Sequence, residues 1–149
     1  MKTMSKFLCC CVAGVTLVTM ALAATILAGG QPEYQPKFHG DPARSDAEAV
    51  ALGYVRTVMR SEHVYQKKNG QYATSLMQLV HVGSFTRRMV EPQQGDYKVD
   101  FHSRKDGFEL TMIPKQIDAD HRSFYGNEKG VIHADDQKTA TEDSAVAKK

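Results

Sequence analysis

The sequence lacks cysteine almost everywhere, and its three cysteines stand side by side at Cys9, Cys10 and Cys11. All three lie in the apolar N-terminal segment, so a chain without that segment would contain no cysteine. A disulfide framework is therefore excluded for the rest of the chain, even in an oxidising compartment. The stability of that part has to come from packing of apolar side chains.

A surplus of basic charge is also missing. The chain has 19 Lys+Arg against 17 Asp+Glu, and Lys2 and Lys6 account for the difference. Because phosphate binding depends on clustered Lys and Arg, nucleic acid is excluded as a partner. The 149 residues leave room for one sizeable core, and 42% hydrophobic with 24% charged residues is ordinary for a soluble domain.

Catalytic motifs are missing as well. The sequence contains no G-x-S-x-G, no H-E-x-x-H and no glycine-rich phosphate loop. We therefore predict a protein that is not an enzyme.

What the chain does have is an N-terminal segment with the layout of a Sec signal peptide over residues 1–23. Lys2 and Lys6 form a positive start, residues 7–28 carry no charge, and Ala21-Leu22-Ala23 supplies the small-x-small pattern before a cleavage site. The uncharged run also reaches the roughly 20 residues that span a bilayer, so the alternative is an uncleaved inner-membrane anchor over residues 7–28. Both interpretations place the rest of the chain in the periplasm or outside the cell.

A linker is predicted for residues 24–44. Three prolines and one glycine fall between Gln31 and Pro42, and proline lacks an N–H donor and clashes inside a helix. Two aromatic residues of this segment, Tyr34 and Phe38, either pack on the following domain or are exposed.

An amphipathic helix is predicted from residue 45 to about residue 68. Ser45 and Glu48 fit a capping box, in which the Ser45 hydroxyl bonds the Glu48 N–H and the Glu48 side chain reaches back. Gly53 inside the helix costs about 1 kcal/mol relative to Ala and is interpreted as a close approach by a strand. Apolar residues recur at helical spacing at Ala47, Ala51, Tyr54, Val58 and Tyr65.

The segment after the helix is predicted to be irregular. Asn69-Gly70 is a natural helix end, and a short helical turn follows, capped by Thr74 or Ser75 and held by Leu76 and Leu79. Residues 80–94 show no period and are predicted to be a loop.

Two β-hairpins are predicted next. Residues 97–102 and 108–113 alternate apolar and polar side chains around a turn that contains Asp-Gly, and residues 123–132 form the second hairpin. One apolar face can lie on the helix. The polar residues 136–149 are predicted to be a disordered tail. The predicted fold class is α+β, with one N-terminal amphipathic helix packed on a small antiparallel sheet of about four strands.

Three stretches of this domain carry a family resemblance: GQYATSL, GFELTMIP and RSFYGNEKGVIHAD. They resemble the turn, strand and terminal hairpin of type IV pilin-like proteins and of the major pseudopilins of type II secretion. The resemblance implies a pilin-like domain over residues 45–135 that acts by protein–protein contact in the cell envelope, within a secretion or pilus-type system. The matching positions are Gly70, Tyr72, Ser75, Leu76, Gly107, Phe108, Pro114, Phe124, Tyr125, Gly130 and Ile132.

The N-terminal part departs from this family. Thr19 stands where a prepilin carries the glutamate that pairs with a neighbour in the filament, and the prolines of residues 24–44 interrupt the helix that would run from membrane to domain. The chain is therefore interpreted as a divergent member, or as a pilin-type domain detached from filament assembly and free in the periplasm.

The best polar cluster is Asp118, Asp120 and His121, with His133 close by in sequence. Calcium prefers loop carboxylates and carbonyls, and the resemblance to major pseudopilins implies calcium in the sheet loops. Carboxylates and histidines from two loops would also suit zinc, whereas the alternative is a solvated loop without a metal. The second functional hypothesis is thus a small periplasmic metal- or ligand-binding protein that uses Asp118, Asp120 and His121.

Overall fold

The computed structural model describes residues 34–36 and 38–148. The predicted signal peptide over residues 1–23 and the alternative anchor over residues 7–28 lie outside these described residues. Within the described part of the chain, no helix combines the length and the apolarity needed to cross a membrane.

The long helix α1 (Asp46–Asn69) begins and ends where the sequence predicts. The Ser45 hydroxyl accepts a hydrogen bond from the Glu48 N–H at 3.1 Å, and Gly70 closes the helix in the left-handed conformation with φ of 77°. One half of the predicted capping box is wrong. The Glu48 side chain does not return to Ser45, because its Oε2 accepts from the N–H of Arg44, one residue earlier, at 2.8 Å.

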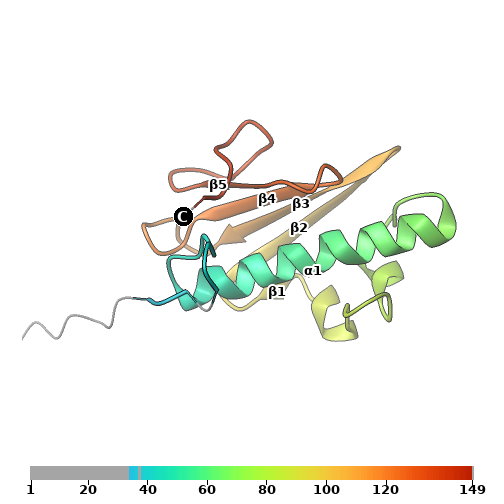
Figure 1. The fold of residues 1–149 in the computed structure, drawn as a ribbon, viewed down its shortest axis with the longest axis horizontal. Coiled ribbons are helices and arrows are strands. Elements are labelled where there is room, and N and C mark those ends of the chain that lie inside the picture. The colour runs from blue at the N-terminus through green and yellow to red at the C-terminus, as the bar shows by residue number, and fades with distance from the viewer. Residues whose placement is uncertain (1–33, 37, 149) are drawn as a thin grey trace, which may run out of the picture. The chain divides into compact units, whose positions relative to one another are not determined.

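The sheet has five antiparallel strands in chain order, β1-β2-β3-β4-β5, and Figure 1 shows α1 lying along one face of it. Both predicted hairpins are confirmed, while the additional strand β1 falls inside the predicted loop of residues 80–94. The coarse α+β architecture is therefore as expected. The strands are β1 (Gln93–Gln94), β2 (Tyr97–Arg104), β3 (Gly107–Pro114), β4 (Ser123–Asn127) and β5 (Ile132–Asp135).

The core lies between α1 and the facing side of the sheet, as the alternating pattern predicts. Fully buried side chains come from both layers, and the ring of Phe101 is half-buried and stacked on Phe108 with centroids 6.1 Å apart. Burial of a large apolar side chain is worth about 1.5–3 kcal/mol, so this layer contact is the main source of stability. Its largest members are Leu52, Val55, Val58, Tyr97, Phe108, Leu110, Met112 and Phe124.

The close approach between helix and sheet is at Gly126, not at Gly53. A Cβ on Gly126 would lie 3.0 Å from Val55 Cγ1 and 3.1 Å from Met59 Sδ, whereas a Cβ on Gly53 would meet nothing within 4 Å. The prediction for Gly53 is wrong because this residue is on the face of α1 that points away from the strands.

Two short 3₁₀ helices, η1 (Leu76–Leu79) and η2 (Arg87–Val90), connect α1 to the sheet. The predicted turn is present at η1, with Leu79 fully buried and Leu76 partly buried. Ser75, one of the two predicted capping residues, takes the N-cap position, but its side chain makes no cap hydrogen bond. The Gln78 side chain instead accepts from the Thr74 N–H at 2.8 Å.

The predicted disorder of the C-terminal tail is wrong for residues 136–148. This segment turns back beside β5 (Figure 1), where the Ala134 N–H donates to Ala145 O at 2.8 Å and the Ala147 N–H donates to Ile132 O at 2.9 Å. Ala140 is buried and its N–H donates to the Ser123 hydroxyl at 3.0 Å. A polar segment is ordered here because it supplies the hydrogen bonds that the outer edge of β5 needs.

The described part of the predicted linker also lies against the domain. Tyr34 packs on the core, whereas Phe38 is exposed. Asp41 is buried and accepts from Arg56 of α1 at 3.2 Å. The linker therefore becomes part of the domain before α1 begins.

Candidate binding site at the start of the helix

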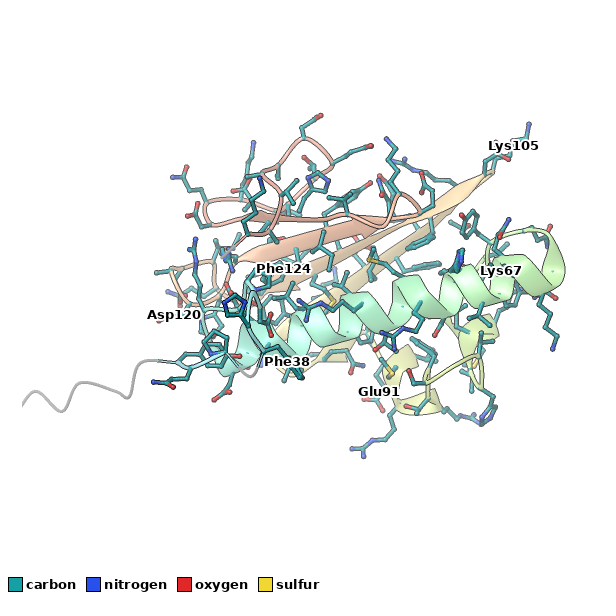
Figure 2. All side chains as sticks on the ribbon, in the orientation of Figure 1. Phe38, Lys67, Glu91, Lys105, Asp120 and Phe124 are labelled. Atoms are coloured by element: carbon teal, nitrogen blue, oxygen red, sulfur yellow. The ribbon has the colours of Figure 1, made fainter. Side chains whose placement is uncertain are left out.

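The predicted site residues lie in a tight turn against Ser45, the N-cap residue of α1. The main chains of Asp118 and His121 form an isolated antiparallel bridge, and the Ser45 hydroxyl donates to Asp120 O at 2.5 Å. In Figure 2, Asp120 and Phe38 lie at one end of the domain and Lys67 and Lys105 at the other. The turn thus shares one end of the domain with the N-terminus of the helix.

Within this turn, the structure brings Asp118 and His121 together and gives Asp120 a main-chain role. Asp118 Oδ1 accepts from the Asp120 N–H at 2.9 Å and lies 2.9 Å from His121 Nδ1. The hydrogen bond with His121, followed by the one from the Asp120 N–H, lowers the pKa of Asp118. Asp118 Oδ1 is therefore already engaged inside the turn.

A metal site built from side chains would need more ligands than this turn supplies. His133 is engaged elsewhere, with its Nδ1 2.6 Å from Ser144 O. Among the residues that the structure describes, no group of three or more His, Cys, Asp or Glu side chains is arranged to hold an ion. Binding of calcium or zinc therefore stays a prediction. Of the predicted ligands, Asp118 and His121 are the two that the structure brings together.

The most strongly bonded charged pair in the domain, Glu48 with Arg122, is one that sequence reasoning missed. Arg122 donates to the Glu48 carboxylate from its Nε at 2.8 Å, from its Nη2 at 2.7 Å and from its main-chain N–H at 2.9 Å. Both side chains are buried, at 0% and 5% exposure. Since the two residues are 74 positions apart, no local sequence pattern predicts the pair.

Arg122 also joins the linker and the sheet to this pair. Its Nη2 donates to Pro42 O at 2.5 Å, and its guanidinium lies 5.5 Å from the centre of the Phe124 ring, within cation–π range. The linker, the first turn of α1 and the start of β4 therefore meet at one guanidinium, directly beside the 118–121 turn.

An open cleft of about 450 Å³ lies next to this pair, between the tail and Arg44 of the linker. Asp135 is engaged inside the tail, because its Oδ1 accepts from the N–H groups of Gln137 and Lys138, each at 3.1 Å. The Gln137 N–H is the main cause that lowers the Asp135 pKa. The cleft offers no single sign of charge to select an ion, since its lining includes Arg44, Arg122, Lys138, Lys148, Asp135 and Asp136.

Acid–base catalysis would need a further partner for the Asp118–His121 pair. Among the described residues, no hydroxyl or thiol is hydrogen-bonded to His121, so the pair has no nucleophile to activate in the manner of a triad. The chemistry that the turn supports is binding through main-chain and carboxylate oxygens.

A second candidate contact surface lies on the outward side of α1. We define the helix stripe as Val50, Gly53, Thr57, Arg60 and Val64, which recur at spacings of three and four residues. The two valines are 58% and 42% exposed. The Thr57 hydroxyl donates back to Gly53 O at 2.8 Å, so its hydrogen-bonding capacity is used within the helix. The helix stripe thus presents two apolar side chains, Val50 and Val64, to the outside, together with the exposed cation Arg60.

Comparison of this chain with protein-family models, with curated proteins and with solved structures finds no match. Function is therefore inferred from the residues and contacts of the chain itself.

Proposed function

We propose that this chain is an exported, non-enzymatic protein of pilin-like type that acts by contact with other proteins of the cell envelope. It would do so in a secretion or pilus-type system, or free in the periplasm. The observation that carries the proposal is the helix stripe, which leaves Val50 and Val64 of α1 uncovered. The apolar segment of residues 7–28 and the motifs shared with pilin-like proteins support export and the pilin-like interpretation.

The helix stripe suits a protein partner for a physical reason. Apolar surface removed from water contributes roughly 25 cal/mol per Å², and anchors three, four and seven residues apart are those that a partner helix or groove engages. Gly53, which has no Cβ and open space above it, lets the partner's main chain come close. A partner protein with an apolar groove for the two valines and a polar or acidic group beside Arg60 fits this surface.

The test is site-specific photo-cross-linking in the native envelope, with the photoreactive residue at Val50 or Val64. The matched control is His63, which is exposed on the same helix but outside the helix stripe. We expect defined cross-links to an envelope protein from the two stripe positions and none from His63. Equal cross-linking from all three positions, or a protein that stays in the cytoplasm, would overturn the proposal.

The exported form is identified in the same preparation by mass spectrometry of its N-terminus. A chain that begins at Ala24 shows signal-peptide cleavage, an intact Met1 shows a retained anchor, and Val15 shows processing as a prepilin. The first two products agree with the sequence interpretation, and the third would make the protein a filament subunit.

The second candidate, a metal- or ligand-binding protein that uses Asp118, Asp120 and His121, is favoured by the 2.9 Å contact between Asp118 and His121. An ion that binds only the folded state raises the melting temperature by mass action. If this candidate is correct, Ca²⁺ or Zn²⁺ raises the melting temperature of the native chain but not that of Asp118→Asn. An equal effect on both chains, or no effect, rejects it.

A further inference from the structure

The two outer edges of the sheet are covered differently. At the β5 edge, residues 145–147 of the tail supply main-chain hydrogen bonds. At the opposite edge, β1 pairs only with the beginning of β2, through Gln93 with Lys98 and Gln94 with Tyr97. Pro92 O, just before β1, accepts from the Val99 N–H at 2.8 Å, and the cover of the β2 edge stops there. We define the open edge as residues 100–104 of β2.

The main-chain groups that this open edge presents follow from the hairpin geometry. Arg104 and Gly107 flank a two-residue turn, so they form a hydrogen-bonded pair and every second residue of β2 bonds to β3. The residues in between point their N–H and C=O groups outward, as the Val99 N–H does. Phe101 and Ser103 therefore each present one N–H and one C=O, and within the described chain no residue bonds these four groups.

We propose that a second copy of this chain pairs with the open edge in antiparallel orientation, about a twofold axis at His102. Phe101 and Ser103 of each copy would then exchange N–H···O bonds with Ser103 and Phe101 of the other. The two sheets would continue into one across the axis. This inference is independent of the partner proposed for the helix stripe.

The charges along β2 are what identify a second copy as the occupant. Side chains alternate between the two faces of a strand, so Asp100, His102 and Arg104 share the outer face. Antiparallel pairing centred on His102 places Asp100 of each copy opposite Arg104 of the other, which joins opposite charges twice. Arg104 also bonds Glu109 of its own chain, and its five donors leave room for the second carboxylate.

The neighbouring registers are unfavourable for the same electrostatic reason. Pairing centred one residue earlier would put Lys98 opposite Arg104 and would collide with β1, which already occupies the edge at Lys98. Pairing centred one residue later would require Asp106, which lies in the turn after β2, as the partner of Asp100, and would bring two carboxylates together. Like charges directly opposite each other destabilise a strand pair, so one register is selected.

A closed dimer, and not a fibre, follows from the covered β5 edge. A chain that could pair at both edges would add copies without limit, but here the tail already occupies one edge. The dimer contact is small and belongs with weak, transient interfaces. It is therefore best detected by trapping.

The first test is disulfide trapping in the full-length chain, with Cys9, Cys10 and Cys11 replaced by Ser and the protein kept in mild detergent. His102→Cys places two thiols opposite each other in a non-hydrogen-bonded pair, where a disulfide is feasible. Lys98→Cys is the matched control, on the same strand and face but far from the axis. We expect His102→Cys to form covalent dimer on the order of tenfold faster than Lys98→Cys. Equal rates would overturn the proposal.

The second test separates main-chain pairing from random collision, in the His102→Cys background. Ser103→Pro removes an outward N–H without removing a bond to β3, because proline lacks this donor, whereas Ser103→Ala keeps it. We expect trapping to slow on the order of tenfold with Ser103→Pro and to stay unchanged with Ser103→Ala. Unchanged trapping with Ser103→Pro would overturn the proposal.

Charge-reversal variants test the same register without introducing a proline into β2. Asp100→Lys and Arg104→Glu, each alone, set like charges opposite each other and should slow trapping by about tenfold. The double variant restores opposite charges in the same register and should restore the rate. A double variant as slow as the single ones would contradict the register and, with it, the twofold pairing.

Discussion

The buried pair of Glu48 and Arg122 makes the largest stability prediction, which is tested by Glu48→Ala. Glu48 is fully buried, and its carboxylate accepts bonds from three donors of Arg122 and from the Arg44 N–H. The substitution leaves a buried guanidinium without its counter-charge. Removing one partner of a buried ion pair typically costs about 3–5 kcal/mol, far more than the loss of an exposed pair.

The assay is urea unfolding followed by circular dichroism, together with thermal melting. At about 4 °C per kcal/mol for a domain of this size, Glu48→Ala should lower the melting temperature by roughly 12–20 °C. The matched control is Asp46→Ala, which is exposed in the same helical turn and should cost less than about 1 kcal/mol.

A double variant distinguishes the cost of an unpaired charge from the cost of a lost contact. Glu48→Met with Arg122→Met removes both charges, and replacement of a buried ion pair by apolar residues is often neutral. We therefore expect the double variant to be more stable than Glu48→Ala. A cost below about 1 kcal/mol for Glu48→Ala would refute the reasoning, because it is the value of an exposed pair.

The remaining predictions concern glycine packing and one buried carboxyl. Gly126→Ala should lower the free energy of unfolding by about 1–3 kcal/mol through overpacking against Val55 and Met59. Gly53→Ala should raise the free energy of unfolding by up to about 1 kcal/mol. Urea unfolding of the two variants measures both changes. Equal effects of the two substitutions would contradict the packing described for Gly126 and Gly53. Glu62 is fully buried, and burial raises its pKa from 4.5 to about 7 although the Ala73 N–H bonds it. Since the folded state then holds this proton more tightly, stability falls as pH rises from about 4.5 through 7. Glu62→Gln should remove that loss, so melting at pH 5 and pH 8 should differ less in the variant; an unchanged difference would contradict the shift.

The helix and the two hairpins could be predicted because their signals are local. Ser45 and Gly70 mark the ends of α1 by capping chemistry, and alternation of side chains marks β2 and β3. Strand β1 and the ordered tail could not be predicted, because each is held by main-chain bonds to residues elsewhere. Such bonds involve every residue type and leave little trace in the sequence.

The same distinction between local and distant partners explains the errors at the candidate site. Asp118 and His121 are only three residues apart, so the polar composition of this segment was enough to predict that their side chains lie together. Glu48 fitted a local capping rule, yet its strongest partner is Arg122, which lies 74 residues further along the chain. Gly53 was assigned the packing role of Gly126 because a glycine's neighbours depend on tertiary structure alone.

The proposed contacts of this domain fit its architecture on physical grounds. In a meander, every strand except the two outermost is satisfied on both sides, so attachment through the main chain can occur only at the edges. The tail bonds to the β5 edge, and β1 pairs with the beginning of β2 at the other edge. The unpaired part of the sheet edge is therefore residues 100–104, a short, charged and self-complementary segment. The proposed contact of the helix stripe uses the exposed side chains of Val50 and Val64, whereas the proposed contact of the open edge uses main-chain groups and the charges of Asp100 and Arg104. High salt should therefore weaken the second contact by screening its exposed charges and leave the first largely intact, so ionic strength alone can separate the two modes of association.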